Sequence, residues 1–264
     1  ADDPLYEIAP AAAPLWRETV CTAMFESEEI MRSVANRLNL ASSQSNIRVL
    51  EDRDWISEIQ ILKSQLKFGD LWVIPPGQIP YGHPKQVVFL EPGIAFGTGA
   101  HPTTALCLKW LSDNPLDQKR ALDFGCGSGI LAIAALKCGA RSVYAVNHHV
   151  QALEATRQNA IRNGVGRQLC VVECADVLRP SFDLIISNIL LNTLTSLKSR
   201  FSKLLAANGT LVLSGITKDQ VDRLYNVYRP DLGIDENRKQ QDSVCLAIQR
   251  KKYVHTRDLT LMSK

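Results

Sequence analysis

The sequence has few of the features that mark secreted, membrane or nucleic-acid-binding proteins. Its seven cysteines include no C-x-x-C pair, which argues against a disulfide framework and against a zinc site. Lys and Arg number 30 against 27 Asp and Glu, an excess too small for a protein held on nucleic acid by phosphate contacts. The longest purely apolar run, Ile130–Leu136, is far shorter than the ~20 residues that cross a bilayer. We therefore expect a cytoplasmic protein with reduced thiols.

Residues 1–66 have the mixed pattern of a small α+β unit. Val20–Phe25 and Ile47–Leu50 are predicted strands, and Ser27–Leu38 is a predicted helix with a serine N-cap and glutamates in its first turn. These elements are too few to close a good sheet, and the chain begins with Ala1 rather than Met. We expect this unit to be truncated, without its first strand and helix.

Residues 67–104 are dense in glycine and proline, which indicates a connector that links domains or forms the wall of a site. In residues 105–250 strands and helices alternate. The predicted strands are Ala121–Phe124, Val143–Val146, Leu169–Val172, Leu184–Ser187, Thr210–Leu213 and a late antiparallel strand, Ser243–Gln249. The predicted helices are Ile130–Cys138, Val150–Asn163, Leu190–Ala206 and one around Asp219–Tyr225. This order predicts an α/β fold with a doubly wound, mostly parallel sheet and ligands at the carboxyl ends of its strands. We interpret residues 251–264 as a tail.

Three glycines, Gly125, Gly127 and Gly129, follow the first of these strands and precede a helix. Glycine lacks the side chain that keeps a backbone away from a ligand, and it adopts turn angles that other residues avoid. We therefore expect a ligand against this backbone rather than a ligand-free turn. The dinucleotide motif G-x-G-x-x-G would need glycine where Ile130 stands, so a nicotinamide-dependent dehydrogenase is not indicated.

Three segments together resemble one family. They are F-G-T-G-A-H-P-T-T within Glu91–Thr104, D-F-G-C-G-S-G at the glycine loop, and S-N-I-L at Ser187–Leu190. They resemble the ribosomal protein L-eleven methyltransferases, the PrmA family of class I S-adenosylmethionine-dependent enzymes, from about Arg48 to Arg250. The resemblance implies a seven-stranded methyltransferase sheet behind a ferredoxin-like N-terminal domain that recognises the substrate.

The resemblance also implies an activity. Methyl groups would pass from S-adenosylmethionine to lysine side chains and the α-amine of a large-subunit ribosomal protein of the stalk base. From the sequence itself we expect a monomer without membrane or direct nucleic-acid contacts. By position, the cofactor contacts fall on Thr104, Gly125, Asn147 and Asn188, with Gly127 in the same loop, and Phe96–His101 would form a wall over the cofactor.

Asn188 ends the fourth predicted strand, and we assign it the catalytic role. Its side-chain carbonyl could accept a hydrogen bond from an incoming amine and direct the nitrogen lone pair at the methyl group. The alternative is that Asn188 caps the following helix, because asparagine is a favoured N-cap. We interpret His101 as a structural hydrogen-bond donor rather than a catalytic base.

Asn147 departs from the family pattern. Family members have D-x-D-P after the second strand, and the first carboxylate accepts from both ribose hydroxyls; this chain has Asn147, His148, His149 and Val150. A neutral amide accepts more weakly than a carboxylate, so we expect a loss of ~1–3 kcal/mol in cofactor affinity. The histidines read as a solvated pair, and we expect no metal. The alternative function is a non-catalytic relative that acts as a binding module.

Overall fold

The computed structural model describes residues 25–38, 65–82, 84–90, 99–174, 176, 178–179, 181–229 and 232–250. The chain divides into two compact units, residues 1–53 and 54–264. In the first unit, α1 (Glu28–Arg37) begins as predicted, because Ser27 Oγ accepts a hydrogen bond from the backbone N–H of Ile30. The predicted strands Val20–Phe25, apart from Phe25, and Ile47–Leu50 lie outside the described residues, as does the tail.

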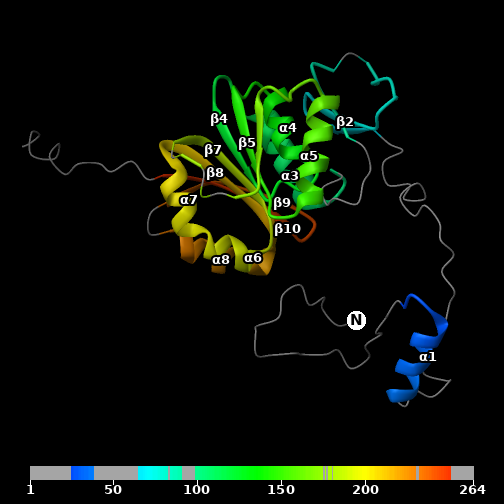
Figure 1. The fold of residues 1–264 in the computed structure, drawn as a ribbon. Coiled ribbons are helices and arrows are strands. Elements are labelled where there is room, and N and C mark those ends of the chain that lie inside the picture. Colours follow the sequence, from blue (N-terminus) through cyan, green and yellow to red (C-terminus); the bar gives the residue numbers. More distant parts are fainter. Residues whose placement is uncertain are drawn as a thin grey trace, which may run out of the picture. The chain divides into compact units, whose positions relative to one another are not determined.

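A seven-stranded sheet forms the centre of the second unit (Figure 1). Its strands are β4 (Arg120–Phe124), β5 (Ser142–Val146), β6 (Leu169–Val172), β7 (Phe182–Asn188), β8 (Leu205–Thr217), β9 (Leu232–Gln240) and β10 (Ser243–Arg250). They lie in the order β6-β5-β4-β7-β8-β10-β9. The first five are parallel, and β10 runs antiparallel to both β8 and β9. The mostly parallel, doubly wound sheet is therefore confirmed, with its antiparallel late strand.

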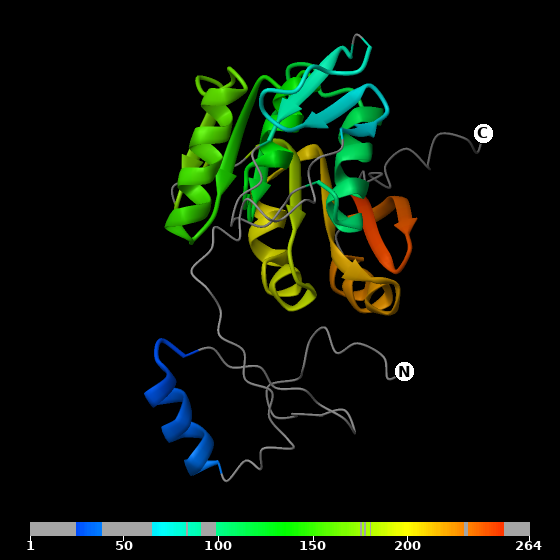
Figure 2. The ribbon, with the colours of Figure 1, turned by 90° about the vertical axis from the view of Figure 1, so that its right-hand side faces the viewer.

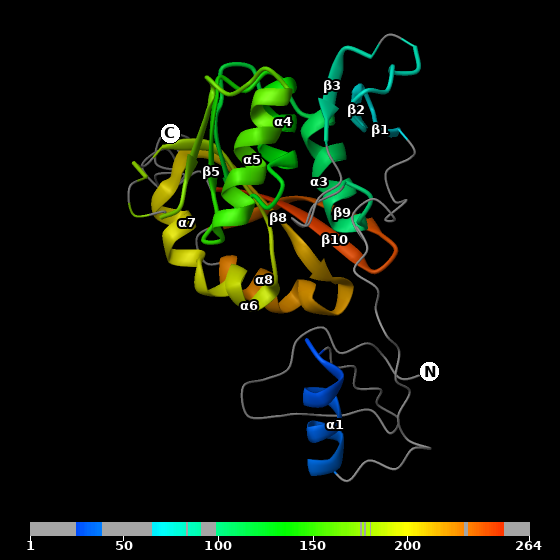
Figure 3. The same ribbon diagram turned by 45° about the vertical axis from the view of Figure 1, so that its right-hand side comes forward.

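Helices cover both faces of this sheet (Figures 1 and 3). One layer contains α3 (Pro102–Asp113), α4 (Ile130–Lys137) and α5 (Val150–Arg162); the other contains α6 (Leu191–Ser196), α7 (Lys198–Leu204), η4 (Lys218–Gln220) and α8 (Val221–Tyr228). The apolar run Ile130–Leu136 is buried throughout as α4. Within the described part of the chain, none of the helices has both the length and the hydropathy that a membrane crossing requires.

Two glycines end helices as the sequence predicts. Gly139 and Gly164 adopt φ of +104° and +68° directly after the C-caps of α4 and α5. In each case the glycine and the next residue donate backbone hydrogen bonds to the last turn, in the Schellman arrangement. These turns return the chain to the sheet at the amino ends of β5 and β6.

The predicted helix Leu190–Ala206 is wrong as a single element, because the structure contains α6 and α7 on either side of Leu197. The hydroxyls of Thr195 and Ser196 donate to backbone carbonyls three residues earlier, and such bonds compete with helical hydrogen bonding. β9 was not predicted, since Leu232–Gln240 is a largely polar segment that pairs only with β10, at the edge of the sheet.

The glycine- and proline-rich stretch contains a small sheet that sequence reasoning missed (Figure 2). Its strands are β1 (Leu66–Phe68), β2 (Leu71–Ile74) and β3 (Gln86–Phe89), with β2 at the centre. Val73 and Val88 are fully buried in the same core as α3 and α4. Asn163, at the end of α5, exchanges two hydrogen bonds with the backbone of Phe89. These contacts attach the small sheet to the helical layer.

Candidate active site

Three predicted site segments meet at one edge of the large sheet. β5, β4 and β7 are neighbours, and all three are parallel. Asn147 follows β5, the glycine loop follows β4, and Asn188 is the last residue of β7. The carboxyl ends of adjacent parallel strands form a common edge, which is where doubly wound folds bind ligands.

Asn188 is held by Thr104, a residue far from it in sequence. Its Nδ2 donates to Thr104 Oγ1 at 3.1 Å, and Thr104 is 1% exposed in the first turn of α3. Among the described residues, none donates a hydrogen bond to Oδ1 of Asn188. The N-cap of α6 is Leu190, so the alternative that Asn188 caps the following helix is wrong. The hydrogen bond to Thr104 thus orients the Asn188 amide, and its Oδ1 is left as an acceptor at this edge of the sheet.

The start of α3 explains how Thr104 is placed. His101 is its N-cap, and the ring Nδ1 of His101 accepts from the backbone N–H of Thr103 and lies 2.7 Å from its hydroxyl. The structural role expected for His101 is thus present, but its Nδ1 acts as an acceptor rather than a donor toward that N–H. Ser214 Oγ also lies within hydrogen-bond distance of the Thr103 carbonyl. Of the expected wall, only residues 99–101 are among the described residues.

Hydrogen bonds to β5 and α5 hold the glycine loop in place. The backbone N–H groups of Gly125 and Cys126 both donate to the Val146 carbonyl on β5. From α5, Thr156 Oγ1 donates to the Gly127 carbonyl at 3.1 Å, and Asn159 Nδ2 donates to the Ser128 carbonyl at 2.9 Å. These bonds hold the loop in one conformation, and they satisfy the carbonyl groups of Gly127 and Ser128 with partners in the protein.

All three loop glycines have positive φ: +86° at Gly125, +55° at Gly127 and +80° at Gly129. A Cβ on Gly125 would lie 2.5 Å from Ile189 Cγ2, and one on Gly129 would lie 2.8 Å from the side chain of Thr156. The expectation that glycine only makes room for a ligand was therefore incomplete. At two of the three positions the missing side chain also makes room for the protein itself.

Asp123 lies beneath the loop and is 1% exposed. Its Oδ2 accepts a hydrogen bond from the backbone N–H of Ala132 in α4 at 3.0 Å. Burial raises the pKa of Asp123 to about 7, and the hydrogen bond from Ala132 lowers it by a smaller amount. Sequence reasoning gave this residue no role, although an aspartate inside the apolar strand Leu122–Phe124 was the available signal.

The side chain of Asn147 forms a hydrogen bond within its own loop, which follows β5. Its Oδ1 accepts from the backbone N–H of His149 at 3.0 Å. Burial raises the pKa of Cys126 to about 12, and hydrogen bonds with Thr156 and Asn147 oppose that rise. The amide oxygen of Asn147 thus already has a partner in the protein.

The two histidines after Asn147 are exposed, and their ring centroids lie 3.9 Å apart. Within the described ranges, no group of three or more His, Cys, Asp or Glu side chains is placed to hold a metal ion.

The comparisons with known proteins agree with this architecture. The family model for ribosomal protein L11 methyltransferase (PrmA) matches residues 1–251. The chain is 39% identical to the ribosomal protein L11 methyltransferase of Hahella chejuensis over 257 residues, covering 96% of this chain and 88% of that protein. It is 41% identical to the protein of the same name from Nitrosococcus oceani over 234 residues, covering 86% of this chain and 80% of the relative.

A solved structure is also similar, the ribosomal protein L11 methylase of Lactobacillus delbrueckii subsp. bulgaricus. It superposes with a TM-score of 0.66 at 29% identity and covers 71% of this chain and 99% of that one. Together with the family match and the identities above, this likeness shows that the chain is a methyltransferase and belongs to the ribosomal protein L11 methyltransferase (PrmA) family.

Proposed function

We propose that this protein uses S-adenosylmethionine to methylate amino groups of ribosomal protein L11, both lysine side chains and the α-amine, in the cytoplasm. The observation that carries the proposal is the pair formed by Asn188 and Thr104 beside the glycine loop. It supplies an acceptor for an N–H group at the edge of the sheet where a methyltransferase of this family would react. Two relatives that are 39% and 41% identical to this chain are named ribosomal protein L11 methyltransferase, which supports the proposed substrate.

The chain's own residues act here by orientation. Oδ1 of Asn188 accepts a hydrogen bond from a neutral substrate amine, which aligns the nitrogen lone pair with the methyl carbon. With the amine held in this way, its nitrogen would take the methyl carbon as the carbon–sulfur bond breaks, and the methylated ammonium would release a proton to water. S-adenosylmethionine, when bound, supplies the methyl group on a sulfonium, which is a good leaving group. Orientation of this kind contributes up to ~7–11 kcal/mol at its favourable limit.

The residues of the site fit the cofactor at some positions better than at others. Gly125 and Gly127 have no side chains that would keep a ligand away from the backbone, and the uncharged residues of this loop suit the neutral adenosine part of the cofactor. Asn147 fits less well, because its Oδ1 already accepts from His149. A ribose hydroxyl would compete with that bond. We therefore propose that Thr104, Gly125, Gly127, Asn147 and Asn188 contact the cofactor, with Asn147 as the weak contact.

Substrate choice is assigned to residues 1–66, and catalysis to residues 105–250, with residues 67–104 between them. The test is incubation of the full chain with S-adenosylmethionine and purified ribosomal protein L11, followed by mass measurement of L11. Additions of 14 Da multiples, located on lysines and the N-terminus by fragmentation, are expected. An unchanged mass for L11, free and within ribosomes, would overturn the proposal.

A second candidate is a binding module that has kept the fold without the reaction. The hydrogen bond from the His149 N–H to Asn147 Oδ1 favours it, since it occupies the neutral acceptor that stands where the family pattern has a carboxylate. Calorimetric titration separates the two. Binding of S-adenosylmethionine with heat release supports the enzyme, and binding of L11 without binding of the cofactor supports the module.

A further inference from the structure

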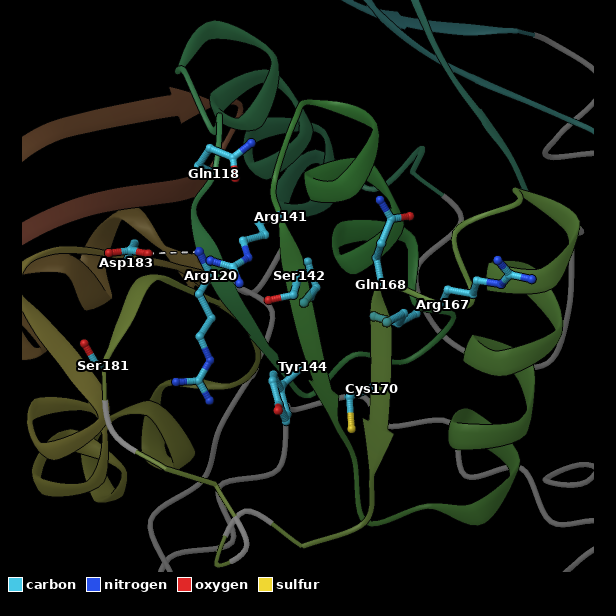
Figure 4. Close-up of a pocket in the computed structure, with 12 residues that line it drawn as sticks. Gln118, Arg120, Arg141, Ser142, Tyr144, Arg167, Gln168, Cys170, Ser181 and Asp183 are labelled. Atoms are coloured by element: carbon cyan, nitrogen blue, oxygen red, sulfur yellow. Dashed lines mark hydrogen bonds between the residues drawn. The ribbon is translucent and has the colours of Figure 1, made fainter.

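A concave surface lies at the edge of the same sheet opposite the proposed methyltransferase site. It is a groove of about 610 Å³ at the amino ends of β4, β5, β6 and β7 (Figure 4). Arg120, Ser142, Tyr144 and Cys170 line it from three adjacent strands, and Asp183 lines it from β7. The proposed methyltransferase site uses the carboxyl ends of these strands, so the two surfaces are separate.

The groove lies where the described residues of one crossover form no helical layer. The connections from β4 to β5 and from β5 to β6 contain α4 and α5, which pack on one face. The described residues of the connection from β6 to β7 contain no α-helix. Strand register pairs Arg120 with Ser142, and Tyr144 with Cys170, so these side chains share the other face. That face is left open at the beginning of the strands.

The charge of the groove has one predominant sign. Arg120, Arg141 and Arg167 line it, against the single carboxylate of Asp183. Asp183 Oδ2 accepts from the backbone N–H of Arg120 at 2.9 Å. Among the described residues, no carboxylate lies within ion-pair distance of Arg141 or Arg167. The groove therefore complements an anion.

The positions of the arginines indicate what kind of anion. The guanidinium of Arg120 lies over the rings of Tyr144 and Phe182, 5.1 and 4.3 Å from their centroids. Arg141 reaches toward Arg120, whereas Arg167 extends away from both (Figure 4). The two exposed guanidinium groups, those of Arg141 and Arg167, extend in different directions and are poorly placed for one free phosphate. They follow the edge of the sheet, as contacts to a chain of phosphates would.

Two further features of the groove favour a chain of phosphates over an acidic peptide as its ligand. A docked peptide needs apolar anchor pockets, but the apolar lining residues Val143 and Leu169 are buried and the guanidinium of Arg120 lies over the ring of Tyr144. Arg, Gln and Ser side chains are among the donors that contact phosphate and sugar oxygens in nucleic-acid complexes, and Gln118, Ser142 and Gln168 also line the groove. Tyr144 is the one aromatic residue among the described residues that line the groove, and because Arg120 lies over its ring we expect no base stacking there.

We propose that this groove binds the sugar-phosphate backbone of single-stranded RNA, independently of sequence. The small excess of positive charge in the whole chain, +3, is consistent with few contacts and weak binding. Arg141 and Arg167 make phosphate contacts, while Arg120 forms the floor of the groove. This expectation replaces the absence of nucleic-acid binding inferred from net charge alone, because charge is concentrated locally here.

The test is fluorescence anisotropy of a labelled single-stranded RNA of mixed sequence, titrated with the full chain over a range of low salt concentrations. Arg141→Gln and Arg167→Gln should each weaken binding several-fold and lower the slope of log affinity against log salt by about 0.7. Lys239→Gln is the matched control, because it removes one exposed positive charge on β9, at the far side of the sheet. It should leave both quantities unchanged.

Competition distinguishes the sources of negative charge. Unlabelled RNA should displace the probe, whereas inorganic phosphate and a polyglutamate peptide at equal charge concentration should not. The proposal is overturned if RNA fails to bind at low salt, if Lys239→Gln weakens binding as much as Arg141→Gln, or if polyglutamate competes as well as RNA. Calorimetry with S-adenosylmethionine should give the same affinity for the arginine variants and the parent, which keeps this test separate from that of the methyltransferase proposal.

Discussion

The two edges of the large sheet use different chemistry on one framework. At the carboxyl edge, Asn188, Thr104 and the glycine loop are uncharged and are held by hydrogen bonds to other parts of the protein. At the amino edge, Arg141 and Arg167 are exposed and have no carboxylate partner among the described residues. The first edge depends on close approach and hydrogen-bond direction, and the second on charge.

This difference has a measurable consequence. Charge contacts at an exposed surface weaken steeply with salt, whereas contacts made by shape and neutral hydrogen bonds do not. Substitutions at the carboxyl edge should therefore change stability, turnover or cofactor affinity with little salt dependence. The predictions below test that separation.

The largest effect is expected at Asp123, the buried acid beneath the carboxyl edge. Its folded pKa of about 7 lies above the ~3.9 of an unfolded aspartate, so the folded state holds the proton more tightly. The unfolding free energy therefore falls as pH rises from about 4 to about 7, by ~1.4 kcal/mol per unit and on the order of 4 kcal/mol in all. Asp123→Asn removes this contribution.

Urea unfolding of the parent and Asp123→Asn at several pH values measures the difference. The gap between the two curves should close or reverse in favour of the variant as pH rises. Parallel curves across this window would mean that Asp123 ionises as readily in the folded state as in the unfolded state.

The next effect separates packing from backbone strain in the glycine loop. Gly129 and Gly77 have nearly equal φ, +80° and +81°, but only Gly129 has a neighbour within 4 Å of an added Cβ. Both alanine variants should lose about 1–2 kcal/mol from left-handed strain. Gly129→Ala should lose about 1–3 kcal/mol more, because Thr156 must move. Equal losses in chemical denaturation would show that the loop does not need this close contact.

A third effect concerns turnover at Asn188. Asn188→Ala removes the acceptor that orients the amine and should lower kcat about 100-fold, which corresponds to about 2.7 kcal/mol. Asn226→Ala, an exposed asparagine on α8, is the control and should retain parent turnover. Full turnover of Asn188→Ala on L11 would remove this residue from the mechanism.

The smallest effect at this edge is expected at Asn147. Asn147→Asp restores a charged acceptor that can still bond to the His149 N–H, and it should strengthen S-adenosylmethionine binding by ~1–3 kcal/mol. The gain should persist at raised salt better than any RNA binding at the amino edge. Equal affinities of parent and variant in calorimetry would contradict the prediction.

Local signals were sufficient for much of the fold. Helix ends at Gly139 and Gly164, the Ser27 cap and the run Leu169–Val172 were predictable because each depends on residues close in sequence. β9 was missed because a polar edge strand is stabilised by its partner β10 rather than by its own apolar pattern. The small sheet was missed because glycine and proline obscured its short apolar strands.

The positions of the site residues could be predicted from the sequence, but the hydrogen bonds and contacts between them could not. Sequence position placed Asn188 at a strand end, but its bond to Thr104 joins residues 84 positions apart. The neighbours of Gly125 and Gly129 likewise come from Ile189 and from α5. The groove at the amino edge lies where the described residues of one crossover form no helical layer, and composition averages its arginines into a net charge of +3.

Hydrogen exchange with and without S-adenosylmethionine tests the central assignment most directly, because bound ligand slows local opening of the backbone it contacts. Protection is predicted in residues 124–130 and 188–190, at the carboxyl ends of β4 and β7, with residues 141–144 and 167–170 at the opposite edge unchanged. Protection confined to the amino edge, or no protection at saturating cofactor, would contradict the assignment.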